Sequence, residues 1–121
     1  MKKGFTLIEV LIVVIILGIL ATIAIPQFAK TVERSRNGEA TTIIGAIQTA
    51  EQVYRLDLQT YTTLLGNLDC TIGAKNWSYT ILAGSDTFTI TATRNSGSYS
   101  NNTITYSELG VWAGTYPFKP S

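Results

Sequence analysis

KKGFTLIEVLIVVIILGILATIAIP, residues 2–26, is the stretch that decides the fold of this chain. From Phe5 to Ile25, strongly polar or hydroxyl side chains interrupt the run only at Thr6, Glu9 and Thr22. As a helix this run spans roughly 32 Å, which matches a hydrocarbon core of about 30 Å. An ionised carboxylate in hydrocarbon is costly unless something pairs with it. Either the segment does not span a membrane, or Glu9 has a partner.

The composition excludes several classes of function. The chain has 121 residues, 45% of them hydrophobic, which is enough for one small domain with one core. Its net charge of +1 gives no electrostatic footprint for nucleic acid. Histidine is absent and Cys70 is the only cysteine, so histidine-based acid–base or metal sites and an internal disulfide are excluded. We expect no cofactor, no metal site and no catalytic residue.

Two ordinary interpretations of the first segment compete. In a cleaved secretory signal, Thr22-Ile23-Ala24 would serve as the cleavage site, but such signals have apolar regions of only about 7–15 residues. A plain membrane anchor explains the length but leaves Glu9 without a reason. Charge does not settle the orientation, because basic residues flank the segment on both sides, at Lys2, Lys3, Lys30, Arg34 and Arg36.

The stretch Lys2-Lys3-Gly4-Phe5-Thr6-Leu7-Ile8-Glu9 resembles the processing motif of type IV prepilins and of the related major pseudopilins of type II secretion. The resemblance continues through Pro26 and the polar helix after it, so it covers about half of the chain. It implies that residues 1–4 are a leader peptide. A membrane peptidase would cut between Gly4 and Phe5 and then methylate the new amino group of Phe5.

The resemblance also implies an explanation for Glu9. Cleavage after Gly4 would leave a positive amine on Phe5, and Glu9 of one subunit would pair with the Phe5 amine of its neighbour as a filament grows. A nearby opposite charge offsets much of the cost of a carboxylate in a low dielectric, and the pair would fix the register between subunits. The alternative is a Glu9 side chain that reaches the membrane interface.

Two residues weaken the first helix. Pro26 lacks an amide donor and disfavours helical geometry in the residue before it, so a kink or local opening is expected there. Gly18 costs about 1 kcal/mol relative to alanine inside a helix. The resemblance implies that the helix melts between Gly18 and Pro26 inside a pilus. The alternative is a gently kinked transmembrane helix, which we favour for the free subunit.

A second, amphipathic half of the helix follows over residues 29–60, ending near Leu58. Its apolar residues recur at helical spacing and predict one face packed on a core: Ala40, Ile43, Ile44, Ile47, Ala50 and Tyr54. A partner groove is the alternative use of this stripe. Glu51 and Arg55 stand at the favourable i,i+4 spacing and are interpreted as a pair on the wetter side.

The remaining residues, 61–121, predict a globular β-rich head. Period-two alternation indicates strands at 77–81, 87–91 and 103–106, with a hairpin loop at 83–86. The expected fold class is α+β: a long N-terminal helix, with a transmembrane half over residues 5–28, packed on an antiparallel sheet of about three strands. This is the ladle shape that the resemblance implies. The tail from Gly110 to Ser121 is expected to be irregular.

The polar residues outside the first helix favour no enzyme. Cys70 has no histidine to activate it and is interpreted as a buried or inert thiol, although an intermolecular disulfide stays open. The family's C-terminal region is often held by an intrachain disulfide, which a single cysteine cannot form. The carboxylates Asp57, Asp69, Asp86 and Glu108 are too scattered for a calcium loop. Because major pseudopilins typically bind calcium near an acidic C-terminal loop, this favours a pilus subunit.

The sequence therefore predicts a structural subunit of a type IV pilus. The resemblance implies its partners: other copies of the chain in a helical filament, a prepilin peptidase and methylase, a membrane platform protein, an assembly ATPase, and membrane lipid before assembly. The precursor would lie in the bacterial inner membrane and the filament outside the cell. The alternatives are a major pseudopilin of type II secretion and a membrane-tethered binding module that does not polymerise.

Overall fold

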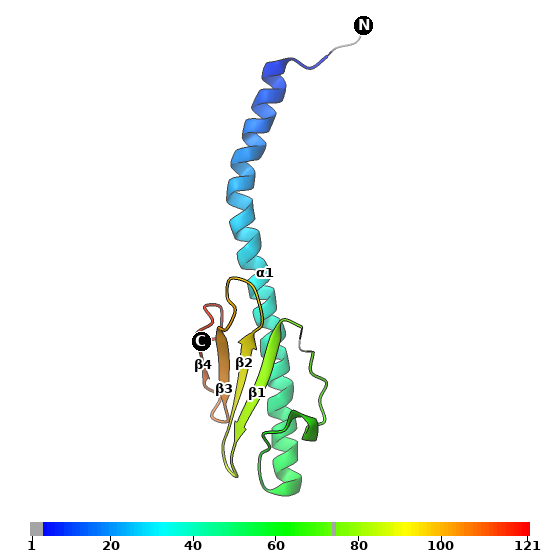
Figure 1. The fold of residues 1–121 in the computed structure, drawn as a ribbon, viewed down its shortest axis with the longest axis vertical. Coiled ribbons are helices and arrows are strands. Elements are labelled where there is room, and N and C mark those ends of the chain that lie inside the picture. Colours follow the sequence, from blue (N-terminus) through cyan, green and yellow to red (C-terminus); the bar gives the residue numbers. More distant parts are fainter. Residues whose placement is uncertain (1–3, 74) are drawn as a thin grey trace. The chain divides into compact units, whose positions relative to one another are not determined.

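The computed structural model describes residues 4–73 and 75–121. The chain forms two compact units, Met1–Arg34 and Ser35–Ser121, which we call the N-terminal unit and the C-terminal unit. Of the predicted leader, only Gly4 lies within the described residues. The fold is α+β, as predicted, with one long helix followed by a small antiparallel sheet (Figure 1).

The helix α1 runs from Leu7 to Leu58, a length of 52 residues. The helix α1 continues through Pro26 without a break, so the local opening considered there is absent and the helix is continuous, as favoured for the free subunit. A proline inside a helix removes one i→i−4 hydrogen bond, which here leaves the carbonyl oxygen of Thr22 without its usual donor. Residues 4–31 are all exposed. None of the apolar side chains between Gly4 and Thr31 is therefore buried within the chain.

The amphipathic half of α1 packs as the spacing predicted. Ala40, Ile44 and Ile47 are fully buried, and Ile43, Ala50 and Tyr54 pack against the same core while partly exposed. The prediction for Glu51 was wrong. This carboxylate is fully buried, and Arg55 pairs instead with Asp86.

The sheet contains one strand more than expected. Strands β1 (Trp77–Ala83), β2 (Phe88–Arg94), β3 (Thr103–Ser107) and β4 (Trp112–Ala113) form an antiparallel meander in that order. The three predicted strands are confirmed, although each ends one to three residues later than predicted and the second begins at Phe88 and not at residue 87. The two residues of β4 pair with Thr105 and Tyr106 of β3, so the tail is not wholly irregular.

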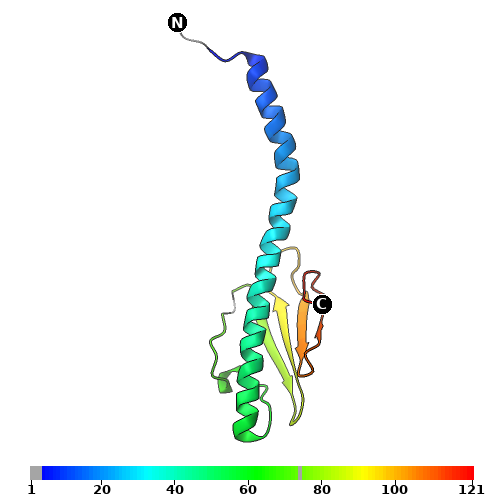
Figure 2. The same cartoon turned by 180° about the vertical axis from the view of Figure 1, so that it is seen from behind.

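One face of the sheet packs on α1 (Figure 2). Inward residues alternate with outward ones along β1 and β2, because successive side chains of a strand point to opposite faces. The inward set is apolar apart from Arg94, which donates to the Asn76 carbonyl oxygen and stacks on the Trp77 ring. The Trp77 indole N–H also donates to the Arg36 carbonyl oxygen at 2.9 Å, which joins β1 to α1.

Aromatic packing holds the C-terminal tail in place. The fully buried Tyr116 ring makes edge contacts with Trp77, Tyr99 and Phe118, with centroids 4.9–5.8 Å apart. Such pairs contribute about 0.5–1.5 kcal/mol each beyond their buried area. The Tyr116 amide also donates to the Thr103 carbonyl oxygen at 3.0 Å. Packing thus anchors the tail of a chain that has only one cysteine.

Candidate functional site

The N-terminal end of α1 carries a reciprocal capping box. Residues 4–6 are not helical, and Thr6 occupies the N-cap position before Leu7. The Glu9 amide donates to Thr6 Oγ1 at 3.2 Å, and the Thr6 amide donates to Glu9 Oε2 at 3.1 Å. A Ser or Thr cap followed three residues later by Glu satisfies two otherwise unpaired amides at a helix start. The sequence stretch Thr6-Leu7-Ile8-Glu9 therefore fixes where α1 begins.

This contact gives Glu9 a partner in its own chain, which sequence reasoning missed. The signal was present, because threonine and glutamate three residues apart before an apolar run is the sequence signature of a capping box. The box uses only Oε2. Among the residues that the structure describes, Oε1 has no hydrogen-bond partner. One oxygen of the carboxylate therefore stays available for an external positive charge.

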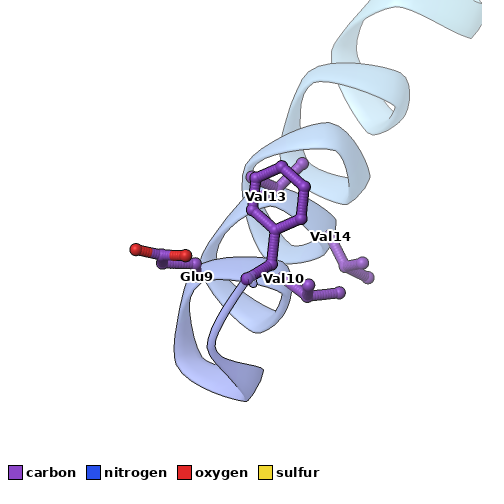
Figure 3. Close-up of a pocket in the computed structure, with 5 residues that line it drawn as sticks. Glu9, Val10, Val13 and Val14 are labelled. Carbon is purple, nitrogen blue, oxygen red and sulfur yellow. The ribbon is translucent and has the colours of Figure 1, made fainter. Parts of the chain in front are cut away.

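A shallow groove on the N-terminal unit brings two of the predicted site residues together. Phe5 and Glu9 line it with Val10, Val13 and Val14. Figure 3 shows the Glu9 carboxylate projecting from the first turn of α1, away from Val10 and Val14. The Phe5 side chain is 90% exposed. Among the described residues that line it, the groove thus offers an apolar surface beside a single charged group, the Glu9 carboxylate.

Gly4 lies in open space. A Cβ atom built on this residue would meet nothing within 4 Å, so packing of the described residues does not require glycine here.

The two predicted weak points, Gly18 and Pro26, lie along α1 with Thr22 between them. The Thr22 hydroxyl donates to the Gly18 carbonyl oxygen at 2.8 Å, a contact that slightly destabilises helices and often bends them. The missing Pro26 amide leaves the Thr22 carbonyl oxygen without its helical donor. Sequence reasoning did not identify Thr22, whose hydroxyl bonds to Gly18 and whose carbonyl oxygen lacks a donor because of Pro26.

By length and composition α1 is able to cross a membrane, and none of its most apolar stretch is buried. Within residues 4–73 and 75–121, no group of three or more Cys, Asp or Glu side chains is placed to hold a metal ion. Cys70 is half-buried, and burial together with the nearby Asp69 raises the pKa of its thiol. The uncharged thiol is a poor nucleophile.

Two family models match the chain. The first, described as the prokaryotic N-terminal methylation motif, matches residues 1–25. The second, described as type IV pilin-like G and H, putative, matches residues 37–111. Together they cover the apolar helix as far as Ile25, most of the amphipathic half of α1 and the first three strands of the sheet.

The chain is similar to curated proteins of two kinds. It is 53% identical over 53 residues to the type IV major pilin protein PilA of Myxococcus xanthus, covering 44% of this chain and 24% of the relative. It is 47% identical over 57 residues to the type IV major fimbrial protein FimA of Dichelobacter nodosus, covering 47% and 36%. It is 37% identical over 71 residues to the type II secretion system core protein G of Aeromonas hydrophila, covering 59% and 50%.

The chain thus spans half or less of the length of these relatives. The relatives are structural pilin and pseudopilin subunits, not enzymes. The second family model alone matches well over half of the chain. With its long apolar helix, the capping box within its N-terminal methylation motif and its small antiparallel sheet, the chain belongs to the type IV pilin-like family.

Proposed function

We propose that this chain is a structural subunit of a type IV pilus. It is processed after Gly4, N-methylated on Phe5 and polymerised through the N-terminal half of α1. The observation that carries the proposal is the complete exposure of residues 4–31. An apolar helix that buries nothing against its own chain needs lipid or other copies of itself around it.

Burial in a filament supplies the driving force for assembly only in part. Burial of apolar surface from water stabilises by about 25 cal/mol per Å², but the helix starts in lipid, which is as apolar as a neighbouring subunit. Extraction from the membrane therefore needs external work. We assign this work to an assembly ATPase acting through a membrane platform protein, with a prepilin peptidase and methylase acting first.

In this proposal Glu9 pairs with the Phe5 amine of a neighbouring subunit. The capping box holds the carboxylate through Oε2 and leaves Oε1 available. Two opposite charges in an apolar surrounding attract strongly, and an axial slip between subunits would leave both uncompensated. The pair would therefore select one register for each incoming subunit.

Gly18 and Pro26 would bound a segment that loses its helical hydrogen bonds in the filament. Support comes from the bond between the Thr22 hydroxyl and the Gly18 carbonyl oxygen, and from the donor that is missing at Pro26. A helical segment that lacks one of its internal hydrogen bonds unfolds locally at a lower cost than an intact one. The free subunit keeps this segment helical.

The second candidate is a major pseudopilin of type II secretion. What favours it is the match to core protein G of Aeromonas hydrophila, which extends over more residues than the match to the Myxococcus xanthus pilin. A titration with calcium separates the two candidates, because a pseudopilin of this kind gains thermal stability from the ion and the proposed pilus subunit does not.

The test of the main proposal separates the charge of Glu9 from its role as a cap. Glu9→Gln removes the charge but keeps an oxygen that accepts the Thr6 amide, since glutamine also serves in capping boxes. Thr6→Ala removes the cap and keeps the charge. Surface filaments are sheared from cells, seen by electron microscopy and analysed by intact mass.

We expect wild-type filaments made of chains that begin at N-methylated Phe5. Glu9→Gln should abolish them, and Thr6→Ala should only reduce them. A Glu9→Gln variant that assembles normally would refute the pairing of Glu9 with the Phe5 amine, whereas a wild-type chain that forms no filaments would favour a tethered module that does not polymerise. A wild-type chain that starts at Met1 would refute processing after Gly4.

A further inference from the structure

The C-terminal unit has two chemically distinct ends along α1, which we call the Ser35 end and the Leu58 end. At the Ser35 end, the Asn76 side-chain amide donates to Glu39 Oε2 at 3.0 Å, just before β1 begins. At the Leu58 end, the Arg55 guanidinium pairs with Asp86 at 2.9 Å, and the Tyr61 amide donates to the Gly84 carbonyl oxygen at 3.3 Å. The β1–β2 hairpin therefore lies beside the C-terminal end of α1 (Figure 1).

Charged side chains are divided unevenly between these two ends. The Ser35 end carries mostly basic residues, which are Arg36, Lys75, Arg94 and Lys119. The acid at this end is Glu39. The Leu58 end carries mostly acidic residues, which are Asp57, Asp69, Asp86 and Glu108. The basic residue at this end is Arg55. The unit is thus basic at one end and acidic at the other.

A groove opens toward the Leu58 end, between α1 and the loop of residues 67–70. Its apolar surface comes mainly from Ala50, Val53 and Tyr54, and Asp57 and Asp69 also line it. Both aspartates are exposed. Neither carboxylate has a hydrogen bond or ion pair with any residue in the described part of the chain. The groove therefore combines an apolar wall with two uncompensated negative charges.

Lys75 at the other end has the complementary charge and is available. It is exposed, and its ammonium group contacts no acid among residues 4–73 and 75–121. The other basic residues of that end are less accessible: Arg36 and Arg94 are engaged within the chain, and Lys119 is half-buried. A lysine also has a long methylene stem, which packs along apolar walls while its charge stays at the rim.

The two sets of charges cannot meet within one chain. Glu39 marks the Ser35 end, because it contacts Asn76, the residue next to Lys75. Asp57 lies 18 residues farther along α1, or about 27 Å of helix. Two copies that are displaced along α1 by about that distance bring the Lys75 of one to the groove of the other. A contact between two different patches of the same chain repeats without closing and builds an open filament.

We propose that the groove lined by Asp57 and Asp69 binds Lys75 of a second copy of this chain, so that the C-terminal units dock head to tail along the filament. The inference rests on the proposed function, because it needs polymerisation. It assigns to the C-terminal unit a contact of its own, separate from the contacts of the N-terminal helix.

The first test is cross-linking in filaments. Because Cys70 is the only cysteine, Cys70→Ser gives a background without thiols. Asp57→Cys and Lys75→Cys are added together, and assembled filaments are oxidised. We expect a ladder of disulfide-linked multimers on a denaturing gel. The control combines Cys70→Ser, Lys75→Cys and Thr63→Cys, which places the thiol in the exposed loop after α1, outside the groove, and should give no ladder.

The second test exchanges the charges in the full chain. Asp57→Lys and Lys75→Asp each place like charges together, so each should lower the sheared filament yield about tenfold. The double variant should restore it. Thr63→Lys, which adds the same charge outside the groove, should leave the yield unchanged.

The outcomes separate this inference from the proposed function. If the wild-type chain makes no filaments, the proposed function fails and the inference falls with it. If filaments form but the Asp57–Lys75 pair gives no ladder, the inference alone is overturned. If Asp57→Lys lowers the yield and Lys75→Asp does not rescue it, the groove binds another partner, and Lys75 is excluded as its ligand.

Discussion

The buried carboxylate of Glu51 gives the sharpest stability prediction. Glu51 Oε2 accepts the Thr62 amide at 2.9 Å, and Oε1 is buried without a partner among the described residues. Thr62 in turn accepts hydrogen bonds from the Leu64 amide and the Asn67 side chain. Glu51 therefore holds the loop after α1 through one backbone contact.

Two variants isolate the value of that contact. Glu51→Gln keeps an acceptor for the Thr62 amide, whereas Glu51→Ala leaves that buried amide unpaired. Neither variant is charged, so their difference reports the hydrogen bond and the lost packing. Leaving one buried polar group unpaired costs about 1–3 kcal/mol. With about 2 kcal/mol as the central value, Glu51→Ala should melt about 8–16 °C below Glu51→Gln.

The pH dependence follows from the direction of the pKa shift. Burial raises the pKa of Glu51 above the usual value for a glutamate, against the opposing effect of the Thr62 amide. A carboxyl group with a raised folded-state pKa binds its proton more tightly when folded, so its stabilisation is complete below the unfolded pKa and is lost as pH rises through the folded pKa. The wild-type chain should lose stability over that interval, and Glu51→Gln should not.

Near-ultraviolet circular dichroism of the full chain in detergent measures the melting temperature of each variant and how it changes with pH. Every tryptophan and tyrosine lies between Tyr54 and Tyr116, so the signal reports the C-terminal unit and not the N-terminal helix. Equal melting temperatures for the alanine and glutamine variants would refute the hydrogen-bond argument. Parallel pH profiles for the wild type and Glu51→Gln would refute the pKa argument.

Three further predictions use the same assay or a simple reaction. Gly114 has a φ of 113° and a Cβ there would overlap the Thr103 carbonyl oxygen, so Gly114→Ala should destabilise the unit by about 3 kcal/mol or more; a melting point equal to wild type would contradict this. Gly45 lies in α1 with nothing within 4 Å of a built Cβ, so Gly45→Ala should stabilise by about 1 kcal/mol, and a lower melting point would show that this glycine has another role. Burial and the nearby Asp69 raise the pKa of the Cys70 thiol, so iodoacetamide at pH 8 should alkylate it more slowly than free cysteine. Protein unfolded in urea is the control. Equal alkylation rates for the folded and unfolded protein would refute the raised pKa.

Local chemistry was enough to predict much of the fold. The apolar run, the stripe that contains Ile44 and Ile47, and the period-two segments around Tyr79 and Ile90 each predicted their element correctly, because burial on one face imposes its period on the sequence. The short strand β4 escaped prediction. Two residues carry no period, and β4 exists only because Tyr106 and Thr105 offer it a neighbouring edge.

The candidate site was predictable in part. The Gly4–Phe5 junction and the unusual carboxylate of Glu9 are visible in the sequence, and so in principle was the Thr6–Glu9 capping box. The pairing of Glu9 with another subunit stays a prediction. The segment between Gly18 and Pro26 was recognised as weak, but it stays helical here, since one missing donor does not outweigh the bonds on either side of it.

Glu51 separates what the sequence determined from what tertiary structure decided. Its position continues the buried stripe of Ala40, Ile44 and Ile47, and periodicity alone would have placed it inside. Its charge favoured solvent, because a carboxylate is rarely buried without a partner. The partner is the backbone of Thr62, which reaches Glu51 only after the loop folds back along α1. Periodicity is a local property of the sequence, whereas a buried charge depends on a donor that only the folded chain brings within reach.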